Sequence, residues 1–253
     1  MAKEMRSVAA VYFDRFNHRE LELNSPVPSN LELIVVIPSH NEPDLLGSLQ
    51  SLKDAFVPNG FSVEVITVIN HGVNTDSDIV KQNETTTIQA NQFSLENNSE
   101  SITFKSIEVF DMPPKKAGVG LARKIGMDEA LNRFSKINKA GIIVCFDADS
   151  LCEVNYFEAI IAHFKKHPKT PGCSIHFEHP LEGNCHTVEE YNAIILYELH
   201  LRYYKNARQY TGLPFVFHTI GSSMAVRASA YAKQGGMNKR KAGEDFYFLN
   251  KII

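Results

Sequence analysis

Several features are scarce in this chain of 253 residues, and each scarcity excludes a class of protein. Tryptophan is absent, and only four cysteines occur, Cys145, Cys152, Cys173 and Cys185, without a CxxC pair. This cysteine pattern argues against a disulfide scaffold and favours a reducing compartment. No apolar run approaches the roughly 20 residues that cross a bilayer, and residues 1–7 lack the apolar core of a signal peptide. We therefore expect a cytoplasmic protein without a transmembrane segment, with peripheral association at the inner face of a membrane as the alternative.

An excess of positive charge is also missing. The chain has 26 lysines and arginines against 29 aspartates and glutamates, which gives a formal net charge of −3. Proteins that bind nucleic acid present a basic surface, so this balance gives no electrostatic case for a nucleic-acid partner. Hydrophobic residues make up 43% of the chain, as in ordinary globular proteins. The length allows one large α/β domain or two small ones.

The chain does contain a regular alternation of apolar strands and amphipathic helices. Strands are predicted at residues 33–37, 61–69, 102–110, 142–146 and 173–178, with extended structure at 214–226. Helices are predicted at 42–56, 77–92, 117–134, 154–164, 187–208 and 228–234, with a final one after Gly243. Four strand–helix repeats predict an α/β fold with a mostly parallel, doubly wound sheet flanked by helices. The helix at 187–208 carries leucines and isoleucines at helical spacing, and we expect it to pack into the core.

The strand at 142–146 is followed at once by two acids, Asp147 and Asp149. In open α/β sheets, ligands bind at the carboxyl edge of the strands. The i, i+2 spacing places both acids on the same side of an extended segment. Two hard oxygen ligands on one side suit Mg²⁺ or Mn²⁺, with diphosphate oxygens and water completing the coordination. The alternative is an ordinary turn with two solvated acids.

Four short motifs follow one another at the ends of predicted strands and helices. Residues 36–42 read Val-Ile-Pro-Ser-His-Asn-Glu, 118–126 read Gly-Val-Gly-Leu-Ala-Arg-Lys-Ile-Gly, 147–149 read Asp-Ala-Asp, and 243–245 read Gly-Glu-Asp. In this order they resemble the nucleotide-sugar-dependent glycosyltransferases of family 2, whose GT-A fold is Rossmann-like. The resemblance covers residues 31–253. It implies a single domain with a nucleotide-binding part at 31–150 and an acceptor-side part at 151–253, preceded by a lead-in segment at 1–30.

The resemblance implies a donor site built from several of these motifs. The residues that would contact the nucleotide are Pro38, His40, Asn41, Glu42, Asn70, Gly118, Arg123, Lys124 and Asp147. At a helix start, backbone N–H groups and the helix dipole favour phosphate, and Arg123 and Lys124 would add positive charge. Asp149 is the first candidate for the metal, Asp147 would bind it through water or hold the ribose, and His218 would be a third ligand. The alternatives are solvated helix cations for Arg123 and Lys124, and a packed or acceptor-lining role for His218.

The last motif would supply the chemistry. Asp245, with Glu244 beside it, is the implied catalytic pair, and Asp245 would take the proton from the acceptor hydroxyl in an inverting transfer. The alternative is helix capping, because acids at a helix start are stabilising in any case.

Two departures from the family pattern matter. The second strand ends in Asn70-His71, where members usually carry an Asp-Asp or Asp-Asn pair that bonds the base. An amide presents a donor and an acceptor, whereas a carboxylate only accepts, so both UDP- and GDP-sugars stay open. The absence of tryptophan means that the Arg-Trp motif of many members is missing, and we expect a short or trimmed member.

The predicted function is therefore metal-assisted hexosyl transfer from a nucleotide-diphospho-sugar to a sugar, glycolipid or small-molecule acceptor, as in the synthesis of cell-surface polysaccharide. One alternative is a non-catalytic module that binds nucleotide sugars. Another is a haloacid-dehalogenase-type phosphatase, whose D-x-D motif normally follows the first strand rather than the fourth. A sugar-1-phosphate nucleotidyltransferase would need a Gly-rich first loop, and residues 38–42 are Pro-Ser-His-Asn-Glu instead.

Overall fold

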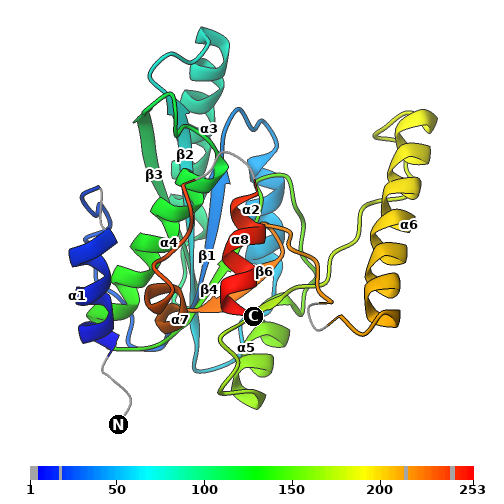
Figure 1. The fold of residues 1–253 in the computed structure, drawn as a ribbon. Helices are drawn as coiled ribbons and strands as arrows, with labels where there is room; N and C mark the ends of the chain where they lie inside the picture. The colour runs from blue at the N-terminus through cyan, green and yellow to red at the C-terminus, as the bar shows by residue number, and fades with distance from the viewer. Residues whose placement is uncertain (1–4, 17–18, 214–215, 240–242) are drawn as a thin grey trace.

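The computed structural model in Figure 1 describes residues 5–16, 19–213, 216–239 and 243–253. It confirms the α/β class, with one six-stranded sheet. The strands are β1 (Leu31–Ser39), β2 (Ser62–Gly72), β3 (Ile102–Met112), β4 (Ile142–Cys145), β5 (Gly172–Ser174) and β6 (Met224–Arg227). The helices are α1 (Met5–Phe16), α2 (Leu45–Asp54), α3 (Ser77–Asn97), α4 (Val119–Lys136), α5 (Tyr156–Lys166), α6 (Val188–Tyr210), α7 (Ala228–Lys233) and α8 (Glu244–Ile252).

The strand order creates a crossing point in the middle of the sheet. The order is β3-β2-β1-β4-β6-β5, and β1 pairs in parallel with both β2 and β4. The chain therefore moves outward from β1 to β3 and then returns to the other side of β1 for β4. β6 runs antiparallel to β4 and to β5, so the sheet is mostly rather than wholly parallel. In such sheets the crevice at the reversal of strand order is the usual ligand site.

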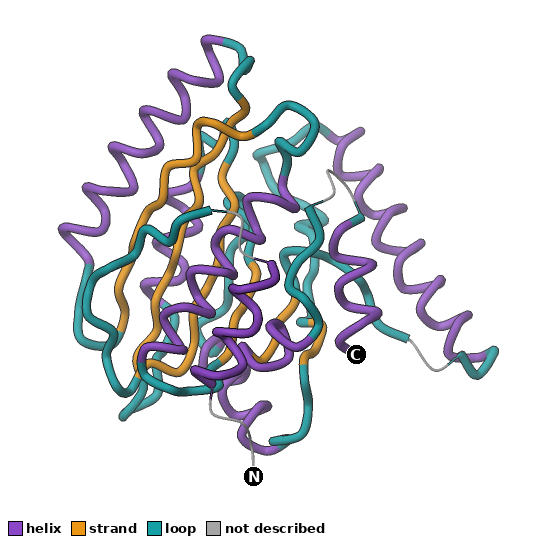
Figure 2. The backbone as a smooth tube through the Cα atoms, turned by 60° about the vertical axis from the view of Figure 1, so that its left-hand side comes forward, coloured by secondary structure: helices purple, strands orange, loops and turns teal. Residues whose placement is uncertain are grey.

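Helices cover both faces of the sheet, as Figure 2 shows from a second direction. Successive residues of β1 alternate between two apolar clusters, because side chains of a strand point to opposite faces. Ile34 and Val36 join the cluster that includes apolar residues of α1, α4, α7 and α8. Leu33 and Val35 join the cluster that includes those of α2, α3 and α5. The central strands are therefore buried on both faces, which explains why their sequences are almost wholly apolar.

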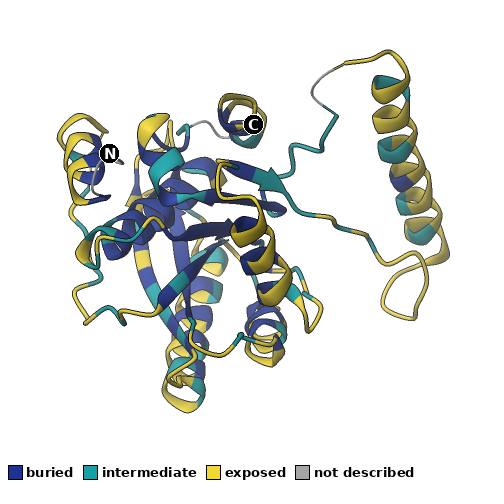
Figure 3. Ribbon diagram, turned by 90° about the horizontal axis from the view of Figure 1, so that it is seen from below, coloured by how far each residue is buried: buried dark blue, intermediate teal, exposed yellow. Residues whose placement is uncertain are grey.

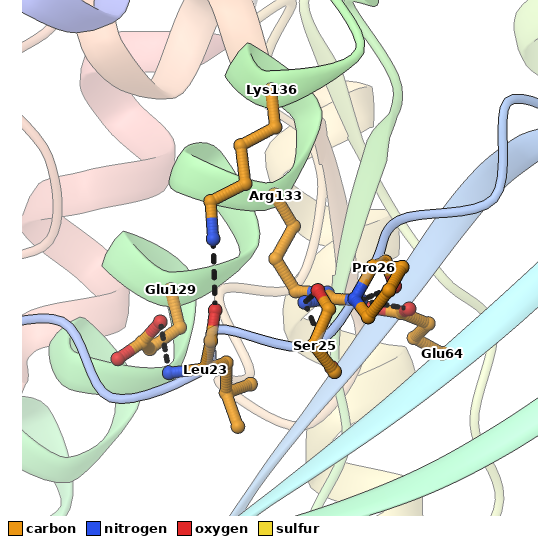
Figure 4. Close-up of polar contacts among 7 residues, drawn as sticks. All are labelled: Leu23, Ser25, Pro26, Glu64, Glu129, Arg133 and Lys136. Atoms are coloured by element: carbon orange, nitrogen blue, oxygen red, sulfur yellow. Dashed lines mark hydrogen bonds and ion pairs between the residues drawn. The ribbon is translucent and has the colours of Figure 1, made fainter.

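The N-terminal segment contains a helix that the sequence analysis did not predict. α1 buries Met5, Val8, Ala9 and Tyr12, an i, i+3, i+4, i+7 pattern, against α4 and α7. Ser25 and Pro26, between α1 and β1, are held by hydrogen bonds from a buried arginine. Figure 4 shows Arg133 of α4, which is 0% exposed, donating to the backbone oxygens of Ser25 and Pro26 at 3.1 Å each while pairing with Glu64 of β2. Residues 5–16 and the segment around Ser25 and Pro26 are thus part of the packed structure.

α6 does not pack into the core, and that prediction is wrong. Glu198 is the sole buried residue of α6, and Leu196 and Leu199 are 66% and 65% exposed. Figure 3 shows the helix standing apart from the buried centre of the molecule. The helix contacts the preceding loop through hydrogen bonds and ring contacts: Glu198 accepts from the backbone nitrogen and ring of His179 at 3.0 and 2.6 Å, and Tyr197 packs edge-on against the same ring. The spacing of apolar residues in α6 predicts an apolar stripe along the helix. It does not predict whether another helix or strand covers that stripe.

No helix in the described part of the chain is both long and apolar enough to cross a membrane.

Candidate active site

A pocket of about 530 Å³ opens at the carboxyl ends of β1, β2 and β4, beside the start of α4. This is the reversal point of the strand order. Its lining residues are Pro38, His40, Glu42, Asn70, His71, Gly72, Asn74, Thr75, Pro114, Ala117, Gly118, Val119, Asp147, Ala148 and Asp149. The register explains their convergence: Ser39 lies opposite Ile69, and Val36 lies opposite Cys145. The residues that follow these pairs therefore meet at one edge of the sheet.

The loop after β1 is held by α3. Asn41 adopts a left-handed conformation with a φ of 54°, and its backbone nitrogen donates to the side chain of Asn83 at 2.9 Å. Asn83, which is fully buried, also donates to the backbone oxygen of Asn70 at 3.0 Å. The same oxygen accepts from Nδ1 of His40 at 2.7 Å. Asn83 therefore joins the first two strand ends, a role that the sequence analysis did not assign.

Asn70 is buried at the pocket with its amide group already engaged. Its Nδ2 donates to the backbone oxygens of Ser39 at 2.8 Å and Val68 at 3.1 Å. Both N–H groups of the amide are thus used, which leaves its carbonyl oxygen as the group available to a ligand. The sequence alone predicts both a donor and an acceptor here. The neighbouring His71 stacks on Phe110 with ring centroids 4.5 Å apart and 10° between the planes.

Three carboxylates face this pocket: Glu42, Asp147 and Asp149. Burial raises the pKa of Glu42 above its ordinary value, and the nearby charge of Asp149 acts in the same direction. No lysine or arginine occurs among the described lining residues. The charged side chains that line the pocket are therefore all acidic, although Asp147 is paired with an arginine behind the pocket.

Arg123 lies behind this edge rather than in the pocket. Its side chain is 3% exposed, donates to Asp147 at 2.9 Å through Nη2, and pairs with Glu244 through Nη1. The guanidinium thus joins the acid after β4 to the first residue of α8. Arg123 contacts the site through Asp147, so a direct phosphate contact is not what this geometry presents.

Lys124 points elsewhere, which corrects its predicted place in the nucleotide site. Its side chain is 2% exposed and bonds Asp128 at 3.0 Å, one turn along α4, and the hydroxyl of Tyr12 in α1. Tyr231 of α7 donates to the same Asp128 at 2.6 Å. Successive helix residues point about 100° apart, so Lys124 serves the packing of α1, α4 and α7 while Arg123 serves the sheet edge.

The Glu-Asp pair divides into a buried and a more accessible acid. Glu244 is 3% exposed and bound to Arg123, so it is an anchor for the start of α8 rather than a free acid. Burial raises the pKa of Glu244, while Arg123 opposes that shift. Asp245 is half-buried in the first turn of α8, where acids are stabilising, and its carboxylate accepts from the backbone nitrogen of Phe246 at 2.7 Å.

The structure does not bring His218 to the two aspartates. Its ring packs edge-on against Phe177 at 5.6 Å. Burial lowers the pKa of His218, and the next largest influences come from Lys205 and Arg202 of α6. These neighbours belong to the acceptor-side part of the chain. As placed here, His218 is not a member of a metal site with Asp147 and Asp149.

The described residues contain no group of three His, Cys, Asp or Glu side chains that would hold a metal ion alone. Whether the pocket suits a divalent cation therefore depends on the carboxylates that line it, together with the oxygens that a ligand would bring. Mg²⁺ in nucleotide sites commonly takes one or two carboxylates, with phosphate oxygens and water as the other ligands. Asp149 and the second oxygen of Asp147 fit that requirement.

Several lining residues were missed by the sequence analysis. They are His71 and Gly72 at the end of β2, and Asn74, Thr75, Pro114 and Ala117 in the loops after β2 and β3. The signal was present, because polar turn residues directly follow the two predicted strands. What the pattern does not show is which loop residues face the ligand.

Comparisons with known proteins bear on the family and the fold of the chain. A sequence model described as glycosyl transferase family 2 matches residues 34–235. None of the curated protein sequences compared with the chain matches it.

Solved structures with a similar fold include two of TarS 1-349 from S. aureus. One has a TM-score of 0.50 at 11% identity and covers 87% of this chain and 55% of that one. The other, in complex with UDP-GlcNAc, has a TM-score of 0.53 at 15% identity, with 87% and 53% covered. A mannosyltransferase, PcManGT from Pyrobaculum calidifontis in complex with GDP-Man and Mn²⁺, has a TM-score of 0.48 at 15% identity, with 98% and 63% covered. The chain thus spans a little over half the length of the TarS structures.

The TarS structures support the GT-A fold, and the family model extends over most of the strands and helices that build the pocket. The chain therefore belongs to glycosyl transferase family 2.

Proposed function

We propose that this pocket binds a nucleotide-diphospho-sugar and that the protein transfers its sugar, a hexose, to an acceptor hydroxyl with inversion at C1. The observation that carries the proposal is the gathering of Glu42, Asp147 and Asp149 at the reversal point of the sheet, without a lining lysine or arginine among the described residues. Arg123 pairs with Asp147 from behind the pocket, but a diphosphate brought to Glu42 and Asp149 would still be repelled unless a cation lay between them.

A divalent cation is therefore part of the proposal, with Asp149 as its main protein ligand and Asp147 as the second. When bound, it would act as a Lewis acid on the leaving diphosphate. The Mn²⁺ of the mannosyltransferase complex belongs to that protein, and here Mn²⁺ or Mg²⁺ is proposed from the charge of the pocket.

The nucleobase proposed for the donor is one that carries a ring N–H. Because Ser39 and Val68 occupy the amide N–H groups of Asn70, its carbonyl oxygen is left to accept from a ligand. Uracil N3–H and guanine N1–H are donors, whereas the ring nitrogen at the corresponding edge of cytosine is an acceptor. Asn70 thus supports donors whose nucleobase carries such an N–H, among them uridine and guanosine, in the place where other members are expected to use an acid.

Asp245 is the proposed general base. It takes the proton of the acceptor hydroxyl as the acceptor oxygen forms a bond to C1 of the sugar. The C1–O bond to the diphosphate breaks, and its electron pair leaves with the nucleoside diphosphate. With one base and direct displacement, the configuration at C1 inverts. The acceptor class proposed is a sugar, a glycolipid or a small molecule with a free hydroxyl.

The experiment that tests the function is a donor panel. UDP-, GDP-, TDP- and CMP-sugars are incubated with the protein and Mn²⁺, and both the thermal shift and the release of nucleotide are measured. We expect stabilisation and nucleotide release with UDP- or GDP-sugars and neither with CMP-sugars. Stabilisation without release, in the presence of candidate acceptors, would favour the non-catalytic module. No response to any donor would contradict the proposal.

A further inference from the structure

Arg123 is the centre of a buried ionic link between two proposed working parts of the protein. One nitrogen of its guanidinium bonds Asp147, which lines the pocket, at 2.9 Å. Another pairs with Glu244, the residue before Asp245. The side chains of Arg123 and Glu244 are each 3% exposed, whereas that of Asp147 is 40% exposed. The link therefore runs from the interior to the pocket wall.

The backbone at Gly221, in the segment before β6, also lies against this guanidinium. Gly221 is buried, and a Cβ built at this glycine would lie 2.8 Å from Cζ of Arg123, closer than real Cβ atoms approach a neighbour. Any larger residue at this position would displace the guanidinium. Arg123 is thus enclosed by four parts of the chain: α4, the end of β4, the start of α8 and the segment around Gly221.

The chemistry of the link requires arginine. A guanidinium is planar and presents separate N–H groups in a fixed arrangement, so it can hold two carboxylates in defined directions at once. A lysine ammonium is a compact point charge on a flexible stem and does not set two directions in this way. Because both carboxylates neutralise Arg123, its charge is already engaged before a ligand arrives.

We propose that Arg123 is a positioning residue, which sets the distance and direction between the donor site at Asp147 and the base Asp245. The inference rests on the proposed function, because it assigns Arg123 a part in aligning the two reactants. By occupying one oxygen of Asp147, which lines the pocket, it leaves the other oxygen for a ligand. By anchoring Glu244, it holds the first turn of α8, and with it Asp245, against the same sheet edge. Misplacement of reacting groups by about 1 Å can cost on the order of 10²-fold in rate.

Arg133 supplies a matched control for a purely structural arginine. It lies on the same helix, is 0% exposed, and also pairs with an acid, Glu64. It donates to the backbone of Ser25 and Pro26, at the other end of α4 from the pocket (Figure 4). Removal of Arg133 should destabilise the fold without moving Asp147 or Asp245.

The experiment compares Arg123→Ala, Arg123→Lys and Arg133→Ala with the wild type. For each, the melting temperature, the donor dissociation constant, kcat and the acceptor KM are measured, with rates expressed per folded molecule. We expect both Arg123 variants to lose on the order of 10²-fold in kcat while the donor dissociation constant changes by only a few-fold. Low millimolar guanidinium should restore part of the rate of Arg123→Ala and leave Arg123→Lys unchanged. Arg133→Ala should have a lower melting temperature and wild-type kcat.

The outcomes separate this inference from the proposed function. A wild type that transfers sugar, together with Arg123 variants that keep wild-type kcat, would overturn the positioning role and leave the function intact. A loss confined to donor affinity would overturn it too, since that result assigns Arg123 to phosphate binding. If Arg123→Ala does not fold, Arg123→Lys decides, because a folded lysine variant with wild-type kcat contradicts the need for two directed bonds. A wild type without any turnover would refute the proposed function instead.

Discussion

Asp149 carries more of the proposed chemistry than its neighbour, because one oxygen of Asp147 is already bonded to Arg123. We predict that Asp149→Asn removes the Mn²⁺-dependent part of nucleoside diphosphate affinity, since a neutral amide is a weaker ligand for a hard cation than a carboxylate. Calorimetry of UDP and GDP binding with Mn²⁺ and with EDTA measures this part. Glu100→Gln, which removes an exposed acid remote from the pocket lining, is the control and should behave as the wild type. Equal affinity of the wild type with Mn²⁺ and with EDTA would refute the metal role.

Asn70 should matter for affinity as well as for the choice of base. We predict that Asn70→Ala weakens nucleotide binding by about 1–3 kcal/mol, the range for removing one partner of a buried hydrogen bond. The measurement is the dissociation constant of UDP or GDP in the presence of Mn²⁺. An unchanged constant would exclude Asn70 from the site. Part of the loss should appear as lower stability, because Asn70 also joins Ser39 to β2.

For single residues, the sequence predicts where the site lies more accurately than it predicts which residue each side chain bonds. Asp147, Asp149 and Asn70 were found because they directly follow apolar strands, and parallel strands end at one edge. Arg123 and Lys124 are adjacent in sequence, yet one bonds Asp147 and the other bonds Asp128. Which neighbour faces the sheet edge depends on how α4 is rotated against β1 and β2. That rotation is set by tertiary packing, which the local pattern does not contain.

Among the helices, α1 and α6 differ most from what the pattern predicts, and among the strands β5 is shorter than predicted, at Gly172–Ser174 rather than 173–178. The i, i+3, i+4, i+7 signal of α1 is present in Met5, Val8, Ala9 and Tyr12, but it is short and is followed by a polar stretch with two prolines before β1. α6 was predicted correctly as a helix and wrongly as a core element. In both cases the missing information is the partner: α1 has α4 and α7 to cover its apolar face, whereas the outer face of α6 is exposed.

The exposure of α6 gives a stability prediction. Leu199 is 65% exposed, so Leu199→Glu should change the free energy of unfolding by no more than about 0.5 kcal/mol. Leu131 of α4 is fully buried, and Leu131→Ala should lower that free energy by about 2–5 kcal/mol. Urea denaturation of both variants makes the comparison. A large loss for Leu199→Glu would mean that α6 is covered in solution.

Over the whole molecule, the class of fold and the parallel central strands followed from the alternation of strands and helices. The direction of β5 and β6 did not follow, because period-2 patterns report a strand and not its orientation. The extended segment predicted at 214–226 yields β6 near its end, at Met224–Arg227, while residues 214–215 lie outside the described part of the chain. The central position of β4 follows from the return of the chain after β3, which only the assembled sheet displays.

Two cysteines test whether β4 lies at the buried centre of the sheet. Cys145 in β4 is fully buried, and burial raises its pKa to about 12, so almost none of it is thiolate at neutral pH. Cys185 is exposed. We predict that a thiol reagent labels Cys185 rapidly in the native protein and labels Cys145 only after unfolding. Peptide mapping after brief labelling identifies the sites, and Cys185→Ser should remove the fast phase. Rapid native labelling of Cys145 would contradict the central place of β4.

The central claim is that Asp245 and the pocket at the strand ends act together in inverting sugar transfer. The most direct measurement is proton NMR of the anomeric signals during reaction of the wild type and Asp245→Asn with the donor that responds in the panel. The wild-type product should carry the inverted anomer at C1. Asp245→Asn should lose about 10²–10⁴-fold in turnover while its donor dissociation constant stays within a few-fold of the wild type. A retained anomer, or an Asp245→Asn variant with wild-type turnover, would contradict the account.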